Sequence, residues 1–130
     1  MQITIDGEPV PKGRPRVVSH GFRTTAYSPE KSRGYADYVK LMVKSEWQHG
    51  KIKRIERPTR VELMVYFFVS TNPWSKPDII NLASEIADCL TGFCYDDDSQ
   101  ITQLICHKFK ASKPRVQIDV RALKDQGEVF

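Results

Sequence analysis

Residues 59–90, TRVELMVYFFVSTNPWSKPDIINLASEIADCL, contain the two elements that decide the fold. The stretch 59–71 begins with alternating apolar residues and becomes continuously apolar, which is typical of a central strand covered on at least one face. An Asn-Pro-Trp sequence ends this strand. A helix is predicted over 78–90, because an aspartate opens it behind a proline and Gly92 stops it. A buried strand followed by an amphipathic helix is therefore the centre of the fold.

The rest of the chain supplies further strands and one long helix. A helix is predicted over 29–48 because apolar residues recur there at steps of three and four. Alternating or β-branched runs predict the extended segments, at 2–6, 10–18, 19–27, 100–110 and 116–120. The order β–β–α–β–α–β–β predicts an α+β fold: a single two-layer domain in which two helices pack on one face of a mixed sheet. We expect this domain to span residues 1–124 and residues 125–130 to form a flexible tail.

Composition is that of an ordinary globular protein. The 130 residues are 40% hydrophobic and 28% charged, which suits one domain with a full core. No apolar run approaches the roughly 20 residues of a membrane span, and the N-terminus does not resemble a signal peptide. We therefore expect a cytoplasmic protein with no membrane partner. Cys89, Cys94 and Cys106 lack a CxxC spacing, which favours buried free thiols over a zinc site.

Charge is divided unevenly along the chain. Residues 1–60 hold 13 Lys or Arg against 6 Asp or Glu, whereas residues 61–130 hold 7 against 10. Lys12, Arg14 and Arg16 recur at every second residue, so in an extended segment their side chains share a face. A phosphate-contacting arm and a solvated loop both fit this pattern. A basic half beside an acidic cluster suits a polyanion partner.

Acidic residues gather around the helix predicted over 78–90. On a helical wheel Asp78, Asn81, Glu85 and Asp88 fall within one arc. Asp78 alone fits a simple N-cap, but three consecutive aspartates follow at 96–98. Adjacent carboxylates repel one another, so such a run is either fully solvated or held by a cation.

We expect these acids to meet. If the strand over 100–110 lies beside the strand over 59–71, its entrance comes near the start of the helix, and Asp78 meets Asp98. Carboxylates with few histidines nearby form a hard oxygen site suited to Mg²⁺, with Mn²⁺ as an alternative. Such a site beside a basic surface points to phosphodiester hydrolysis, with a lysine stabilising charge on the phosphate.

Four short motifs, in this order and at these separations, resemble those of the RusA family of phage-type Holliday junction resolvases. They are VPKGRPR, KPDIINL, ADCLTG and YDDDSQI, and the match runs from Ile3 to about Val120. The resemblance implies a homodimer of small α/β subunits, bacterial or phage-encoded, that acts in DNA recombination and repair. It implies binding to branched DNA at four-way junctions and symmetric cutting of two opposing strands with Mg²⁺ held by aspartates.

The resemblance also implies roles for individual residues. Asp78 matches the first metal-binding aspartate of the family, Asn81 matches its asparagine, and Asp98 matches the aspartate before Ser-Gln. We therefore assign three groups of residues: catalytic Asp78, Asp98 and Lys76; metal-binding Asp78, Asp97 and Asp98; and supporting Asn81, Glu85 and Asp88. We assign DNA binding to Lys12, Arg14, Arg16, Lys76 and Arg23.

Two positions depart from the family pattern. Ile80 stands where the motif places its second aspartate, and Ser84 stands where members carry a lysine. Losing one carboxylate lowers metal affinity, unless water or Glu85 fills the gap. Ser84 supplies no positive charge, but Lys76 is close in sequence and can substitute for the missing lysine. The first alternative is therefore a catalytically weakened or inactive module that still binds junctions. A second alternative is a basic domain with no role in DNA.

Overall fold

The structure is a computed structural model that describes residues 1–11, 16–20, 23–27 and 30–124; for residues 16–20, 23–27 and 30–33 it describes the backbone alone. The predicted tail over 125–130 and two predicted DNA contacts, Lys12 and Arg14, lie outside the described residues. Helix α1 spans Glu30–Gln48 and helix α2 spans Ile79–Leu90, and a short 3₁₀ helix, η1, spans Asp98–Gln100. The strands are β1 (Gln2–Asp6), β2 (Arg16–His20), β3 (Arg23–Tyr27), β4 (Arg60–Val69), β5 (Ile101–Lys110) and β6 (Arg115–Leu123).

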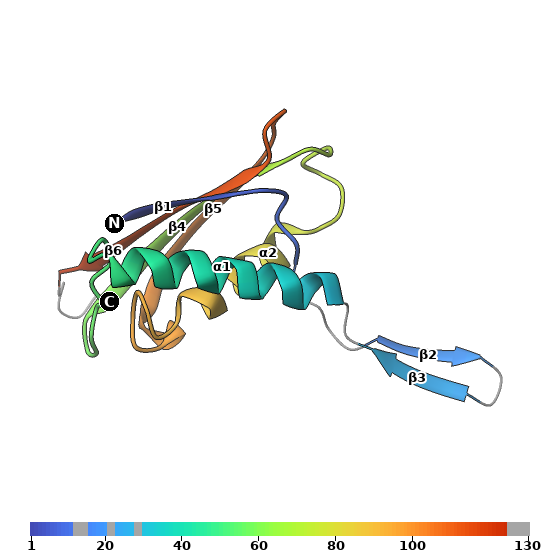
Figure 1. The fold of residues 1–130 in the computed structure, drawn as a ribbon, viewed down its shortest axis with the longest axis horizontal. Coiled ribbons are helices and arrows are strands. Elements are labelled where there is room, and N and C mark those ends of the chain that lie inside the picture. Colours follow the sequence, from blue (N-terminus) through green and yellow to red (C-terminus); the bar gives the residue numbers. More distant parts are fainter. Residues whose placement is uncertain (12–15, 21–22, 28–29, 125–130) are drawn as a thin grey trace, which may run out of the picture.

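Four of these strands form one mixed sheet in the order β1-β6-β4-β5. β6 runs antiparallel to both β1 and β4, whereas β5 runs parallel to β4. Both helices lie on one face of this sheet (Figure 1). The predicted α+β class, with two helices on one face of a mixed sheet, is confirmed.

Strands β2 and β3 pair with each other as a separate two-stranded sheet. The sequence predicts an extended segment followed by a turn and one short strand, and the pairing makes these a hairpin. Arg16 pairs with Tyr27 and Arg23 pairs with His20, so the two arginines stand at opposite ends of the ladder. Strand β6 also continues to Leu123, beyond the predicted end at residue 120.

The core lies between the sheet and the helices. Alternate residues of β4 point into it: Val61, Leu63, Val65 and Phe67 have no exposed area. The predicted apolar stripes of the helices supply the opposite wall, with three fully or nearly fully buried side chains from each: Tyr35, Val39 and Val43 of α1, and Leu82, Ile86 and Leu90 of α2. The central place predicted for the strand over 59–71 is confirmed, because β4 has a neighbour on each side.

No helix in the described part of the chain is long and apolar enough to cross a membrane.

Candidate active site at one end of the sheet

Asp78 stands at the start of α2, just beyond the end of β4. Its backbone is extended, as an N-cap requires, and its Oδ1 accepts a hydrogen bond of 2.9 Å from the Asn81 amide. The Asn81 side chain donates a second, longer bond to Oδ2 at 3.3 Å. The carboxylate is therefore fixed from one side by two donors, and its remaining lone pairs face outward.

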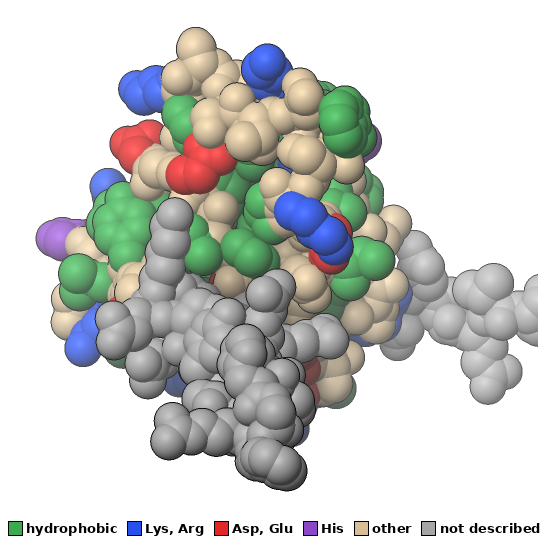
Figure 2. Space-filling view, turned by 90° about the vertical axis from the view of Figure 1, so that its right-hand side faces the viewer, with side chains coloured by type: hydrophobic (Ala, Val, Ile, Leu, Met, Phe, Trp, Pro, Cys, Tyr) green, Lys and Arg blue, Asp and Glu red, His purple; other side chains and the backbone are tan. Residues whose placement is uncertain are grey.

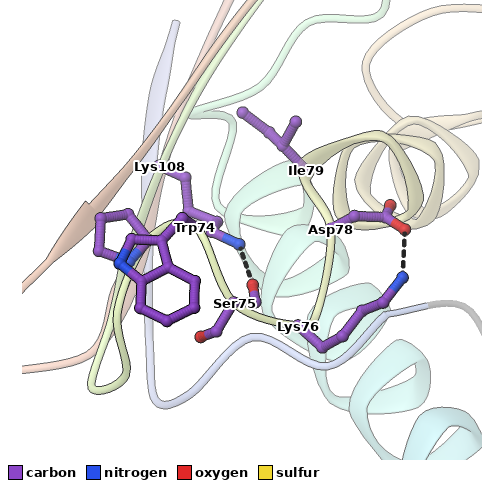
Figure 3. Close-up of a pocket in the computed structure, with 7 residues that line it drawn as sticks. Trp74, Ser75, Lys76, Asp78, Ile79 and Lys108 are labelled. Atoms are coloured by element: carbon purple, nitrogen blue, oxygen red, sulfur yellow. Dashed lines mark hydrogen bonds and ion pairs between the residues drawn. The ribbon is translucent and has the colours of Figure 1, made fainter.

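A lysine lies against the outward side of this carboxylate. Lys76 Nζ is 3.6 Å from Asp78 Oδ2, and the lysine side chain is 90% exposed (Figure 3). The hydrogen bond from the Asn81 backbone amide lowers the pKa of Asp78 below its ordinary value of 3.8, and the charge of Lys76 lowers it further. Asp78 is therefore ionised at neutral pH, and the exposed lysine is available to an incoming anion.

A second lysine holds the loop that precedes Asp78. Lys108 Nζ, on β5, donates hydrogen bonds to the Ser75 carbonyl at 2.8 Å and to the Pro77 carbonyl at 2.5 Å. Its charge also contributes to lowering the pKa of Asp78. Lys108 was not predicted from the sequence, because only the pairing of β5 with β4 brings it to the start of α2.

A shallow pocket of about 600 Å³ opens at this point. Lys76, Asp78 and Lys108 supply its charged lining, and Trp74 forms one side (Figure 3). Trp74 is 83% exposed, so a large aromatic ring projects on the side of the pocket across from Asp78 (Figure 3). Seen from the side of the molecule on which the loop between β4 and α2 lies, cationic side chains alternate with acidic and hydrophobic ones (Figure 2).

The three consecutive aspartates lie elsewhere, in the turn that leads into β5. Asp97 caps η1 by accepting a hydrogen bond of 3.0 Å from the Ser99 amide. Hydrogen bonds from the Ser99 hydroxyl and amide lower the pKa of Asp97. Asp96 accepts a bond of 2.9 Å from the Arg57 amide and pairs with Arg54 at 3.7 Å. Asp98 is exposed.

Gln100 anchors this acidic turn to the body of the protein. Its buried side chain accepts from the Asp96 and Asp97 amides at 2.8 and 3.0 Å. Its amide nitrogen donates to the Ile55 and Thr59 carbonyls at 3.1 and 2.9 Å. All four of its hydrogen-bonding valences are thus used to shape the turn, which explains the Ser-Gln that follows the acids.

The expected meeting of Asp78 with Asp98 does not occur within one chain. β5 does lie beside β4, but the two strands are parallel, and Ile101 pairs with Val61 at the beginning of β4. Asp78 lies near Lys108, seven residues further along β5, which is roughly 20 Å at the rise of a strand. The expectation was wrong because it placed the entrance of β5 near the end of β4.

The other two residues predicted to support the site, Glu85 and Asp88, differ in burial. Glu85 was expected on the polar arc with Asp78, but it is buried at 5% exposure and accepts a hydrogen bond of 3.6 Å from Cys89 Sγ. Asp88 is half-buried near the end of α2, two turns and more beyond Asp78.

Burial and the neighbouring Glu85 raise the pKa of Cys89 to about 12. Cys89 and Cys94 are buried free thiols, as predicted.

The two positions that depart from the family pattern lie on one apolar groove. Ile80 is 78% exposed and Ser84 is exposed. With residues of α2 and β5 they line a groove of about 340 Å³ that also includes Leu104, which is 54% exposed. This groove runs beside the outer edge of β5, the last strand of the sheet.

Comparison with known proteins bears directly on this site. The family described as "Endodeoxyribonuclease RusA" matches residues 6–121, a span that includes both helices and the acidic turn. The chain is also 30% identical to the uncharacterized protein YqaN of Bacillus subtilis (strain 168), over 93% of this chain and 95% of that protein. The chain belongs to the RusA endodeoxyribonuclease family.

Proposed function

We propose that this protein is a structure-selective endonuclease that cuts four-way DNA junctions, as a homodimer and with a divalent metal, in DNA recombination or repair. The observation that carries the proposal is Asp78: an ionised carboxylate oriented by Asn81 and flanked by an exposed lysine, in a chain of the RusA endodeoxyribonuclease family. An oriented carboxylate beside a cation is what positioning of a metal ion and a phosphate requires.

One chain alone does not assemble a metal site from the residues that the structure describes. Within them, no group of three or more His, Cys, Asp or Glu side chains lies close enough to hold a metal ion. The two sets of acids also lie at opposite ends of β5. A site with Asp78 and the acidic turn therefore needs a second chain.

The outer edge of β5 is suited to bring that second chain. It is one of the two edges of the four-stranded sheet, the other being β1, and the groove beside it exposes Ile80 and Leu104. If two copies pair β5 antiparallel across a two-fold axis, the start of β5 in one copy lies beside its end in the other. Asp78 of one copy would then face Asp97 and Asp98 of the second. We infer that two such shared sites form in each dimer.

The donor set of a shared site fits a hard cation. Asp78 of one copy, with Asp97 and Asp98 of the other, would hold Mg²⁺ or Mn²⁺, which prefer carboxylate oxygens. When bound, such an ion would polarise the phosphate and make its bound water more acidic. Asn81 keeps the Asp78 carboxylate in one orientation, and Lys76 is placed to neutralise a phosphate oxygen. Lys108 fixes the loop on which Lys76 and Asp78 stand.

Phosphate contacts are assigned to Lys76 within the site and, away from it, to the basic N-terminal half. Arg16 and Arg23 belong to the β2–β3 hairpin, and Lys12 and Arg14 precede it in the sequence. Contacts of this kind position the protein without reading bases, so binding should weaken steeply with salt. A double Arg14→Ala, Arg16→Ala variant should bind junctions more weakly at fixed salt and show a shallower salt dependence. Unchanged affinity would refute this assignment.

The cleavage activity is tested with a labelled four-way junction and Mg²⁺ or Mn²⁺. Wild-type protein should cut two opposing strands, and the Asp78→Asn variant should bind the junction but cut it at least about a hundredfold more slowly. Asp37→Asn, a surface change on α1, is the matched control for loss of one negative charge and should cut normally. If wild-type and Asp78→Asn proteins are equally inactive in every metal, the nuclease proposal fails.

A second candidate is a junction-binding protein with weak or no cleavage. It is favoured by Ile80, an exposed apolar side chain two residues after Asp78 where the family pattern places a carboxylate, and by the missing lysine at Ser84. It predicts structure-selective binding without cutting, and recovery of cleavage in an Ile80→Asp, Ser84→Lys variant. Efficient cutting by the wild-type protein would exclude it.

A further inference from the structure

The face of the sheet opposite the helices carries a patch of four aromatic rings. Tyr66 and Phe68 of β4 lie beside His107 and Phe109 of β5, and we name these four residues the aromatic patch. The ring centroids of Tyr66 and His107 are 5.5 Å apart with planes 11° from parallel. Those of Phe68 and Phe109 are also 5.5 Å apart, at 26°. His107 and Phe109 close the group at 5.8 Å and 14°.

These rings are not buried by the fold. Phe109 is 43% exposed, His107 is exposed, and Tyr66 and Phe68 are half-buried. Parallel rings at these separations are offset rather than superposed, so part of each ring remains uncovered. A contiguous aromatic surface of this kind on a soluble protein indicates a binding site.

Cations flank the patch at one end. The guanidinium of Arg115 lies 3.9 Å above the Phe68 ring. Lys113, in the turn after β5, is exposed, and so is Lys110, the last residue of β5, which alternates with Phe109 onto the other face of the sheet. An anionic polymer with flat apolar groups matches this combination, because phosphates meet the cations while the flat groups stack on the rings. A second copy of this chain docked on the patch through the same surface would instead bring its own cations against these cations, and like charges would repel.

The patch lies at the same end of β5 as the candidate active site. Lys108, which holds the loop before Asp78, stands between His107 and Phe109 in the strand and points to the opposite face of the sheet. A DNA strand stacked on the patch would thus pass Lys110 and Lys113 on its way round the end of the sheet.

We propose that the aromatic patch binds unpaired bases of single-stranded DNA, such as nucleotides released where a junction is opened. This proposal rests on the proposed function, because the choice of DNA as the ligand of the patch depends on the protein acting on DNA. Base stacking of this kind depends on π faces and tolerates any sequence. The site would therefore hold a strand without selecting its bases.

The test uses a fluorescently labelled 16-nucleotide oligothymidine at one fixed salt concentration, with binding followed by anisotropy. Phe109→Leu keeps an apolar side chain but removes the π face, and it should bind about tenfold more weakly. Phe109→Trp keeps a ring and should bind like the wild type. Leu41→Ala, which alters an exposed apolar residue on the outer side of α1, is the control and should have no effect.

Several outcomes would overturn the proposal. These are oligothymidine binding by Phe109→Leu equal to the wild type, and no measurable binding by the wild type itself. A third is a change of oligomeric state in Phe109→Leu by sedimentation, which would make the patch an interface between copies. Failure of the nuclease proposal would look different from failure of the patch proposal. In that case the wild type would bind oligothymidine through the patch but would neither bind nor cut junctions.

Discussion

Asp78 shows how one residue can serve folding and function together. Its carboxylate caps α2 through the Asn81 amide and pairs with Lys76 on its outer side. The capping bond leaves lone pairs on both oxygens, so the structural role does not exclude a second one. The sequence raised both readings, and the geometry is compatible with both at once, because the capping bond uses the Asn81 amide while the Asp78 side chain stays 43% exposed.

The lowered pKa of Asp78 predicts a specific dependence of stability on pH. A carboxyl group whose pKa is lower in the folded state stabilises the protein fully above the unfolded pKa, and this contribution disappears as pH falls through the folded value. Asn at position 78 keeps a cap but carries no charge. Urea unfolding should therefore show wild type more stable than Asp78→Asn at about pH 7, and the difference should shrink below about pH 4.

A difference between the two proteins that stays constant between about pH 7 and about pH 3 would contradict this account. It would mean that the charge on Asp78 contributes nothing to the folded state.

At the scale of the elements, the helices and strands followed closely from sequence, whereas their mutual placement did not. α2 is predicted because the Asp78 cap, the apolar stripe of Leu82 and Ile86, and Gly92, with φ of 89°, all agree. The place of the acidic turn was missed because a strand pattern does not state the direction of pairing. The order strand–helix–strand does favour a parallel pair, and that signal was available in the chain.

Long-range polar contacts were likewise beyond sequence reasoning. Gln100 reads as one polar residue at the start of a strand, yet its side chain joins the acidic turn to the Ile55 and Thr59 carbonyls. Lys108 reads as an exposed charge in an alternating strand, yet it holds the loop before α2. In both cases the partner lies more than 30 residues away and only the sheet register brings it close.

The acidic turn should depend on Gln100. Replacing Gln100 with Ala leaves two backbone amides and two carbonyls without their partner, so we expect a loss of about 2 kcal/mol in the free energy of unfolding. Gln103→Ala, at an exposed position of β5 three residues further along the chain, is the matched control. Urea denaturation measures both variants, and a cost for Gln100→Ala no larger than that for Gln103→Ala would show that the turn holds without it.

At the scale of the whole molecule, the fold separates the acids that were predicted to form one metal site. Asp78 lies at one end of β5, and Asp97 and Asp98 lie at the other. The edge of β5 and its apolar groove stand between the two sets. Two copies related by a two-fold axis would reunite them, so oligomerisation and catalysis are expected to depend on each other.

The groove should therefore control assembly. A Leu104→Arg variant places a charge on the apolar wall beside β5, and it should raise the dissociation constant of the dimer about tenfold or more. Leu41→Arg, at a position of similar exposure on α1, is the control and should leave the dimer intact. Sedimentation over a range of concentrations measures both, and a Leu104→Arg protein that dimerises normally would place the interface elsewhere.

The most direct test of a site shared between two copies is complementation. An Asp78→Asn chain and an Asp97→Asn, Asp98→Asn chain should each be inactive on a four-way junction. After the two are mixed in equal amounts and allowed to exchange, about half of the dimers are mixed, and each mixed dimer contains one intact site of its two. The sample should then hold about a quarter of the wild-type number of intact sites, and single-strand nicking should reappear. If the mixed sample, with exchange verified, remains as inactive as its components, the shared site does not exist.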